Sequence, residues 1–348
     1  MNRIMGGPVN RLVYDEDELL ESHDYARPHI EGEQLLHGGF DADGKYVSPR
    51  TLNREPAIDG WGEALRRRGG DLLAADASLL AGVRYPTAAQ QKLLIREGLD
   101  QTFWNMLTIT GQIEARGRVL AEVDFPDVQQ FVVEDVSEMA IGHLNRGLLL
   151  AHGIDEGGEP ERGIGGHDAM WFALRDLAFG ETDYAEPETP ELARAQRHAA
   201  EVRGLPIGAL HLVDFLANLL LIEFRAERGF SFSESVLRDP ELFAERRAEA
   251  ERAAEIVGRI RQDEEIHVRS LRLYLGEIKE LNFETDDGGT ISGSDVVDAL
   301  WDGLVGWATV DQPELIAEQQ RALFAGRILA HPDGERILRD FNALEGEQ

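Results

Sequence analysis

Apolar residues recur with helical spacing along most of the chain and predict four long helices. The patterns cover residues 86–123, 126–151, 206–228 and 239–281. Gly153 and Gly229 follow the second and third patterns, as glycine commonly does at the end of a helix. Asp239-Pro240 opens the fourth pattern with a capping side chain and a proline in the first turn. Together these patterns predict a helical bundle.

Shorter patterns add helices before, between and after the long ones. They cover Pro56–Arg68, His167–Phe179, Pro190–Arg203 and residues 294–307, 313–330 and 334–343. The sequence contains no internal repeat and no run of alternating apolar residues long enough for a sheet. The predicted fold class is therefore all-α.

The region before the first long helix has a different character. Residues 37–50 are dense in glycine, aspartate and other turn formers. The same region is too rich in tyrosine, tryptophan and phenylalanine to be disordered. We expect one compact domain in which residues 1–85 form an irregular N-terminal arm that wraps a bundle. The bundle would cover residues 86–285, and residues 286–348 would add a C-terminal helical extension.

The fourth helix carries the first candidate chemistry. Glu264 and His267 lie three residues apart on its apolar stripe, whereas Glu265 points away from that stripe. A buried carboxylate without a partner is energetically costly. A metal ion shared with His267 would provide the partner, and a Glu–His hydrogen bond within the core is the alternative.

Two further carboxylates lie on apolar stripes of other helices. Glu223 shares the most apolar stripe of the chain with Leu212 in the third helix. Glu114 lies on the stripe of the first helix, where Gly111 and Gly117 leave space beside it. A helix–helix contact through small residues, with Glu114 at its edge, is the alternative there.

The second helix leaves its ligands open. Glu138 and His143 lie on different faces of a regular helix, so they cannot bind one ion. A single π-bulge beside Gly142 would bring them together, and such bulges favour functional sites. Without a bulge, His143 is a core histidine, and His152 or His167 would provide the missing imidazole.

Composition narrows the chemistry further. The chain has no cysteine, so any metal must be held by carboxylates and imidazoles, a ligand set that suits iron or manganese. The net charge of −30 argues against nucleic acid or an anionic membrane as a partner. We see neither a signal peptide nor a sufficiently long apolar run for a membrane span, which favours a cytoplasmic location.

The candidates follow a recognisable order: Glu114, Glu138 with His143, Glu223, and Glu264 with His267. This order resembles the ferritin-like diiron-carboxylate superfamily, in which two helices each give one Glu and two give Glu-x-x-His. The likeness covers roughly residues 87–285. Ile222–Arg228 looks like the third helix of hydroxylase-type members, and Asp263–His267 looks like their fourth. The second helix departs from the pattern, because a plain Glu-x-x-His is absent.

The resemblance implies a ferritin-like four-helix bundle that binds two iron ions, with manganese as the other option. Glu264 would bridge or chelate iron, and His267 would complete the ligands of one ion. The expected activity is a dinuclear iron oxygenase or oxidase acting with dioxygen and an external electron donor on a small or lipid-like substrate. A homodimer is compatible with it. The alternatives are a ferroxidase or iron-handling protein, and a non-enzymatic helical interaction protein without metal.

Some features have both a functional and a structural interpretation. Phe103, Leu107, Phe215 and Leu219 lie beside the proposed ligands and would line an apolar substrate cavity, or simply pack in the core. Two glycine-rich histidine motifs, His37-Gly38-Gly39 and Gly165-Gly166-His167-Asp168, are expected to serve as turns or caps.

Overall fold

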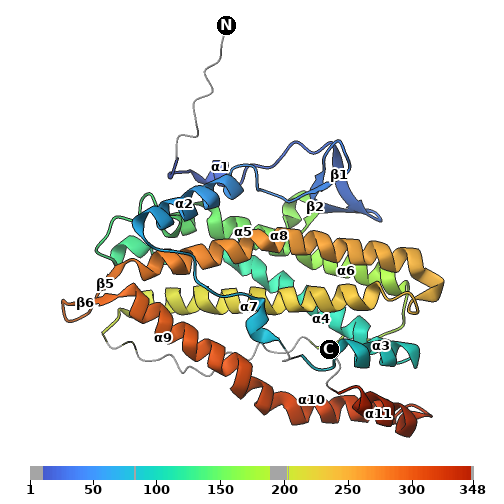
Figure 1. The fold of residues 1–348 in the computed structure, drawn as a ribbon. Helices are drawn as coiled ribbons and strands as arrows, with labels where there is room; N and C mark the ends of the chain where they lie inside the picture. The colour runs from blue at the N-terminus through green and yellow to red at the C-terminus, as the bar shows by residue number, and fades with distance from the viewer. Residues whose placement is uncertain (1–10, 82–83, 189–201, 203, 346–348) are drawn as a thin grey trace.

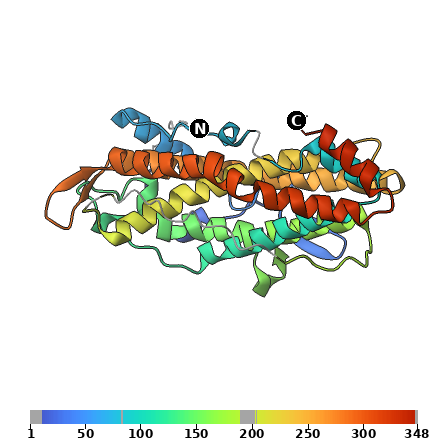
Figure 2. The ribbon, with the colours of Figure 1, turned by 90° about the horizontal axis from the view of Figure 1, so that it is seen from below.

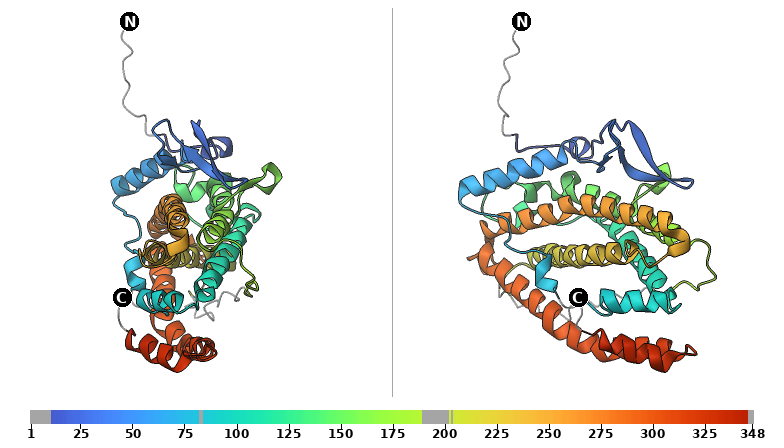
Figure 3. Two further views of the ribbon diagram at one scale, coloured as in Figure 1. Left: turned by 90° about the vertical axis from the view of Figure 1, so that its right-hand side faces the viewer. Right: turned by 45° about the vertical axis from the view of Figure 1, so that its right-hand side comes forward.

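The computed structural model describes residues 11–81, 84–188, 202 and 204–345, and the chain is mostly helical (Figure 1). Its centre is built from α4 (Gln101–Gly117), α5 (Leu149–Gly157), α6 (His167–Phe179), α7 (Ile207–Leu237) and α8 (Arg247–Lys279). Helix α7 packs along α8, α4 packs along both α5 and α6, and α6 joins the two layers through α8. The end-on view in Figure 3 (left) shows the layer of α7 and α8 beside the layer of α4, α5 and α6.

Most predicted helices are present, with shifted ends. The first pattern divides into α3 (Ala88–Arg96) and α4, because Gly98 takes a left-handed conformation (φ +76°) between them. Helix α7 continues through Gly229 to Leu237, and α8 begins at Arg247 rather than at Asp239. The helix predicted over Pro190–Arg203 lies outside the described residues.

The second long helix was predicted wrongly. Residues 126–148 instead form short turns: the 3-10 segments η3 (Val128–Gln130) and η4 (Ala140–His143), then the π-helical η5 (Leu144–Leu148). The end of the first pattern is likewise a 3-10 segment, η2 (Arg118–Ala121). Between η3 and η4 the backbone bonds elsewhere, since Val133 N donates to Asn282 O and Phe131 O accepts from Glu284 N. Gly147 (φ +114°) then interrupts η5. The regular α-helix starts only at Leu149.

The N-terminal arm contains a small sheet that the sequence did not predict. Strands β1 (Arg27–Glu31), β2 (Gln34–Phe40) and β3 (Tyr46–Val47) pair antiparallel, and β4 (Ile164–Gly165) pairs parallel to β2. Strands β3 and β4 have two residues each, and buried and exposed positions do not alternate strictly along β1 or β2, so the sequence shows no strand pattern. The arm also holds α1 (Glu16–Leu19), α2 (Arg54–Arg68) and the 3-10 turn η1 (Ala77–Leu80).

The C-terminal extension lies on the opposite side of the bundle from the arm (Figures 1 and 3). It contains β5 (Asn282–Glu284), β6 (Thr290–Ser292), α9 (Gly293–Gly306), the π-helical η8 (Trp307–Asp311), α10 (Gln312–Leu329) and α11 (Gly334–Ala343). Helix α9 packs on α7 and α8, and α11 returns to α3. Figure 2 shows α9 and α10 running along the bundle in one direction, and α11 turning back beside α10. Two further 3-10 turns are η6 (Pro160–Arg162) and η7 (Ala244–Arg246).

Helix α7 is the one helix among the described residues that is long and apolar enough to cross a membrane. Half of its most apolar window is buried inside the protein. Core helices of large bundles share this composition, because they are covered on most sides. The length and composition of α7 are therefore weak grounds for a membrane span.

Candidate metal centre

The bundle helices bring four carboxylates and three imidazoles together in its interior. Each of these side chains is at least nine-tenths buried. They are Glu114 of α4, His152 and Glu156 of α5, His167 of α6, Glu223 of α7, and Glu264 and His267 of α8. Their nitrogen and oxygen atoms form two groups of metal-ligand spacing that share Glu156.

The first group contains His152, Glu156, Glu223 and His267. Nε2 of His152 lies 3.0 Å from Oε1 of Glu223 and 3.5 Å from Oε1 of Glu156. Nδ1 of His267 lies 3.4 Å from the same oxygen of Glu156. Two imidazoles and two carboxylates therefore converge on one point.

The second group contains Glu114, Glu156, His167 and Glu264. Nδ1 of His167 lies 3.0 Å from Oε1 of Glu264 and 3.6 Å from Oε1 of Glu156. The other oxygen of Glu264 lies 2.7 Å from Nδ1 of His267, in the first group. Glu264 thus reaches both groups with different oxygens, and the second group has a single imidazole.

Small residues allow the helices to approach closely around these carboxylates. A side chain at Gly117 would overlap Glu156, and one at Gly111 would press on Trp171 of α6. Gly153 similarly lies against the backbone at Ala121. The space predicted beside Glu114 is therefore filled by neighbouring helices, one of which carries Glu156.

His167 reaches the centre because α6 begins there. It is the first residue of α6, after a turn in which Gly166 lies too close to Gly158 for any side chain. The glycine-rich motif around His167 thus has the structural role expected of it. In addition, it places an imidazole at the centre. The sequence had left His167 as one of several possible sources of this imidazole, besides His143 and His152.

The structure brings together four of the six predicted ligands: Glu114, Glu223, Glu264 and His267. Each lies on the buried stripe that the helical spacing predicted. Their role as metal ligands remains a prediction.

Glu138 and His143 are the two that the structure places elsewhere. Glu138 is exposed in a turn, because residues 131–139 are not helical. His143 is buried, but its Nδ1 bonds the carbonyl oxygen of Met139, its Nε2 accepts from Tyr14 N, and its ring packs on Trp61. His143 is therefore a core histidine, which is the second of the two alternatives: residues 131–139 are not helical, so no π-bulge joins Glu138 to His143.

Sequence reasoning missed Glu156 altogether and left His152 and His167 as alternatives. Both histidines are in the centre, together with Glu156. His152 and Glu156 are one turn apart in α5, so they share a face. The predicted second helix ended before them, which removed this His-x-x-x-Glu signal from consideration.

Several buried atoms in the centre have no hydrogen-bond partner. They are Nε2 of His152, Oε1 of Glu156, Nδ1 of His167 and Oε1 of Glu264. Buried polar atoms in native proteins are nearly always satisfied. Here the lone pairs converge at ion-pair distances without hydrogen-bond geometry, which is the arrangement that a bound cation satisfies. The donor set therefore fits metal ions.

The electrostatics favour the same interpretation. Burial and then Glu156 raise the pKa of Glu114 well above its usual value, and burial and then Glu264 do so for Glu223. Burial opposes a charge on His167 and on His267, but the neighbouring Glu264 nevertheless raises the pKa of both. The centre thus retains protons that bound metal would displace.

Two more carboxylates adjoin the ligands. Asp155 bonds Arg50 and Arg54, and Asp263 bonds His37 and Tyr46. Once bound metal displaced the retained protons, six carboxylates and two guanidinium groups would leave four negative charges in the interior. Two divalent cations would balance this charge, which is otherwise costly to bury.

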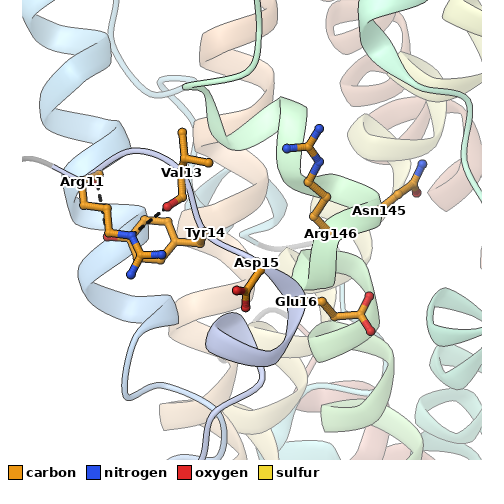
Figure 4. A pocket seen from close by; sticks show the side chains of 7 residues that line it. All are labelled: Arg11, Val13, Tyr14, Asp15, Glu16, Asn145 and Arg146. Carbon is orange, nitrogen blue, oxygen red and sulfur yellow. Dashed lines mark hydrogen bonds between the residues drawn. The ribbon is translucent and has the colours of Figure 1, made fainter.

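A surface hollow of about 440 Å³ lies elsewhere, between the start of the arm and η5 (Figure 4). Arg11, Tyr14, Glu16 and Arg146 are among its lining residues, and none of the candidate ligands lines it. It therefore has no part in the arrangement described above.

A scan against models of known protein families finds no match, and searches of curated proteins and of solved structures likewise return none.

Proposed function

We propose that the protein binds two iron ions at the buried centre and uses them as a dioxygen-dependent oxygenase or oxidase of the ferritin-like type. The observation that carries the proposal is the set of buried, unpartnered atoms that converge from α5, α6 and α8. The ligands are oxygen and nitrogen atoms without thiolate, a set that suits iron or manganese. The bundle would be α4, α5 with α6, α7 and α8.

The two groups divide the proposed ligands unequally. Glu114 and His167 would hold one ion, while His152, Glu223 and His267 would hold the other. Glu156 and Glu264 face both groups and would help to hold both ions. Bound iron would supply the chemistry that the side chains lack, the transfer of electrons to dioxygen.

The chain itself would protect and orient this centre. Buried apolar clusters from all five helices keep bulk water away from the carboxylates. Asp155 lies 3.0 Å from Nε2 of His267, so the opposite nitrogen faces the proposed metal position. A proton held at Nε2 leaves the lone pair of Nδ1 for the metal.

A small or lipid-like substrate is the best match to the apolar surroundings. Phe103 and Leu107 are fully buried in an apolar cluster, which favours core packing as their role. Phe215 and Leu219 are only partly buried, two turns and one turn before Glu223 in α7. We place the substrate on this side of the centre, in the cytoplasm, with an external electron donor.

Oxygen consumption tests the proposal. Protein loaded anaerobically with ferrous ion and supplied with a chemical reductant should consume dioxygen faster than reductant and iron alone. Glu156→Gln, loaded in the same way, should not exceed that background. Equal oxygen consumption by both proteins would contradict the proposal. Light scattering measures the assembly size of the loaded protein. An iron-storage protein would need a large hollow assembly, whereas an oxygenase or oxidase would not.

A further inference from the structure

Two carboxylates next to the candidate ligands contact ligand histidines from behind. Asp155 precedes Glu156 in α5, Asp263 precedes Glu264 in α8, and both are almost fully buried. Oδ2 of Asp155 lies 3.0 Å from Nε2 of His267. Oδ2 of Asp263 lies 3.5 Å from Nε2 of His167, as an ion-pair contact. In each case the imidazole's Nδ1 faces the centre.

The N-terminal sheet holds Asp263. The hydroxyl of Tyr46 in β3 donates to Oδ2 of Asp263 at 2.8 Å, and Nε2 of His37 in β2 lies 3.2 Å from the same oxygen. Farther out, His29 bonds the His37 carbonyl oxygen and is itself bonded by Arg259 of α8. The sheet is thus fastened to α8 and reaches its buried side.

The segment that follows the sheet holds Asp155. Nε of Arg50 donates to Oδ1 at 2.9 Å, and Nη2 of Arg54, at the start of α2, donates to Oδ2 at 2.6 Å. Both guanidinium groups are at least nine-tenths buried. A carboxylate bonded to two guanidinium groups is ionised and can only accept, so Nε2 of His267 must keep its proton.

We infer that the N-terminal arm completes the metal centre, because His37, Tyr46, Arg50 and Arg54 position His167 and His267 through Asp263 and Asp155. The inference rests on the proposed function, because it concerns the ligands of the proposed ions. The arm residues are positioning residues: they fix which imidazole nitrogen carries the proton and how the ring is turned. Outer partners of this kind commonly change metal affinity by about 10–100-fold.

The two halves of the arm act on different ions. Tyr46 acts through Asp263 on His167, the single imidazole of the second group. Arg54 acts through Asp155 on His267, in the first group. Removing one arm contact should therefore weaken one metal position and spare the other.

Cobalt(II) titration of the full-length protein tests this separation, with binding followed by calorimetry and by the visible absorption of the bound ion. Tyr46→Phe and Arg54→Gln each remove one arm contact. Asp59→Asn is the matched control, because it breaks the exposed Arg269–Asp59 ion pair, another contact between the arm and α8. Melting temperatures are recorded for all variants.

The unaltered protein and Asp59→Asn should each bind two cobalt ions. The affinity and the absorption spectrum of each binding step should be the same in both proteins. Tyr46→Phe should weaken one binding step by about 10–100-fold, and Arg54→Gln the other step. A merely structural role would lower melting temperatures without separating the two steps.

If folded Tyr46→Phe binds both cobalt ions as tightly as the unaltered protein does, the inference about the arm is wrong, while the proposed function stands. This conservative variant decides the question if Arg54→Gln fails to fold. Absence of cobalt binding by the unaltered protein would overturn the proposed function as well.

Discussion

The imidazole rings of His152 and His267 stack with their centroids 3.8 Å apart and an angle of 15° between their planes. They come from α5 and α8, and both belong to the first metal group. Burial and then the neighbouring His267 lower the pKa of His152. His152 is therefore neutral in this stack, the form in which an imidazole binds a metal ion.

His152 belongs to one group only, which gives a specific expectation. His152→Ala should lose one ion and keep the other, because the second group retains Glu114, Glu156, His167 and Glu264. Elemental analysis of the desalted, ferrous-loaded variant measures this. Retention of two ions, or loss of both with the fold intact, would exclude the division into two groups.

Glu156 belongs to both groups, so its replacement should have a larger effect. Glu156→Gln keeps the side-chain volume but removes the shared charge, and neither ion should remain after desalting. Glu138→Gln is the control, because Glu138 is exposed in a turn. The same metal content in both variants would show that Glu156 is not a ligand.

Glu223 and Glu264 could be found from the sequence, whereas Glu156 was missed and Glu138 was chosen wrongly. Glu223 and Glu264 could be predicted because long helices place them on apolar stripes that local spacing reveals. Helix α5 has nine residues and follows a region of short turns, so periodicity located the second helix too early. Local spacing also carries no information about residues 131–139, whose backbone bonds Asn282 and Glu284.

For the fold as well, local sequence patterns predicted helices but not the contacts between distant segments. Helices α6 and α11 have the predicted bounds, because Gly166 and Gly180 flank α6 and Pro332-Asp333 precedes α11. The contacts of the arm could not be predicted, since Tyr46 and Asp263 are 217 positions apart in sequence. Only the packed structure brings such residues together.

Gly38 offers a test of the arm that avoids changing any polar group. It has φ +68°, and a methyl group there would overlap the hydroxyl of Tyr46. Gly38→Ala should therefore displace Tyr46 from Asp263 and weaken cobalt binding at one position. Gly32→Ala is the control, because Gly32 has φ +60° with open space around it.

Both glycine variants should lose about 1 kcal/mol of stability through backbone strain. Only Gly38→Ala should change metal affinity. Equal metal affinities in the two variants, measured by the same titration, would argue against a positioning role for Tyr46.

The buried carboxyl group of Glu277 should make the free energy of unfolding depend on pH, whether or not metal is bound. It is fully buried in α8, where it accepts from Ile141 N and lies 3.6 Å from Arg68. Burial raises its pKa to about 7. Between the usual carboxyl pKa and 7, the folded protein binds the proton that the unfolded chain has lost, so stability falls as the pH rises.

Glu277→Gln should remove this loss, since the amide stays neutral. Relative to the variant, the free energy of unfolding of the unaltered protein should fall by on the order of 3 kcal/mol between pH 5 and pH 8. Urea unfolding of both proteins at several pH values measures the difference. Parallel pH profiles would mean that Glu277 is ionised in the folded protein throughout this range.

The proposed function requires that the buried centre hold two metal ions. The iron content of the full-length protein, measured after anaerobic loading with ferrous ion and desalting, tests this requirement. We predict two iron atoms per chain in a protein whose circular dichroism shows that it is folded and mostly helical. A folded protein that retains no iron, or only one atom per chain, would contradict the proposed function.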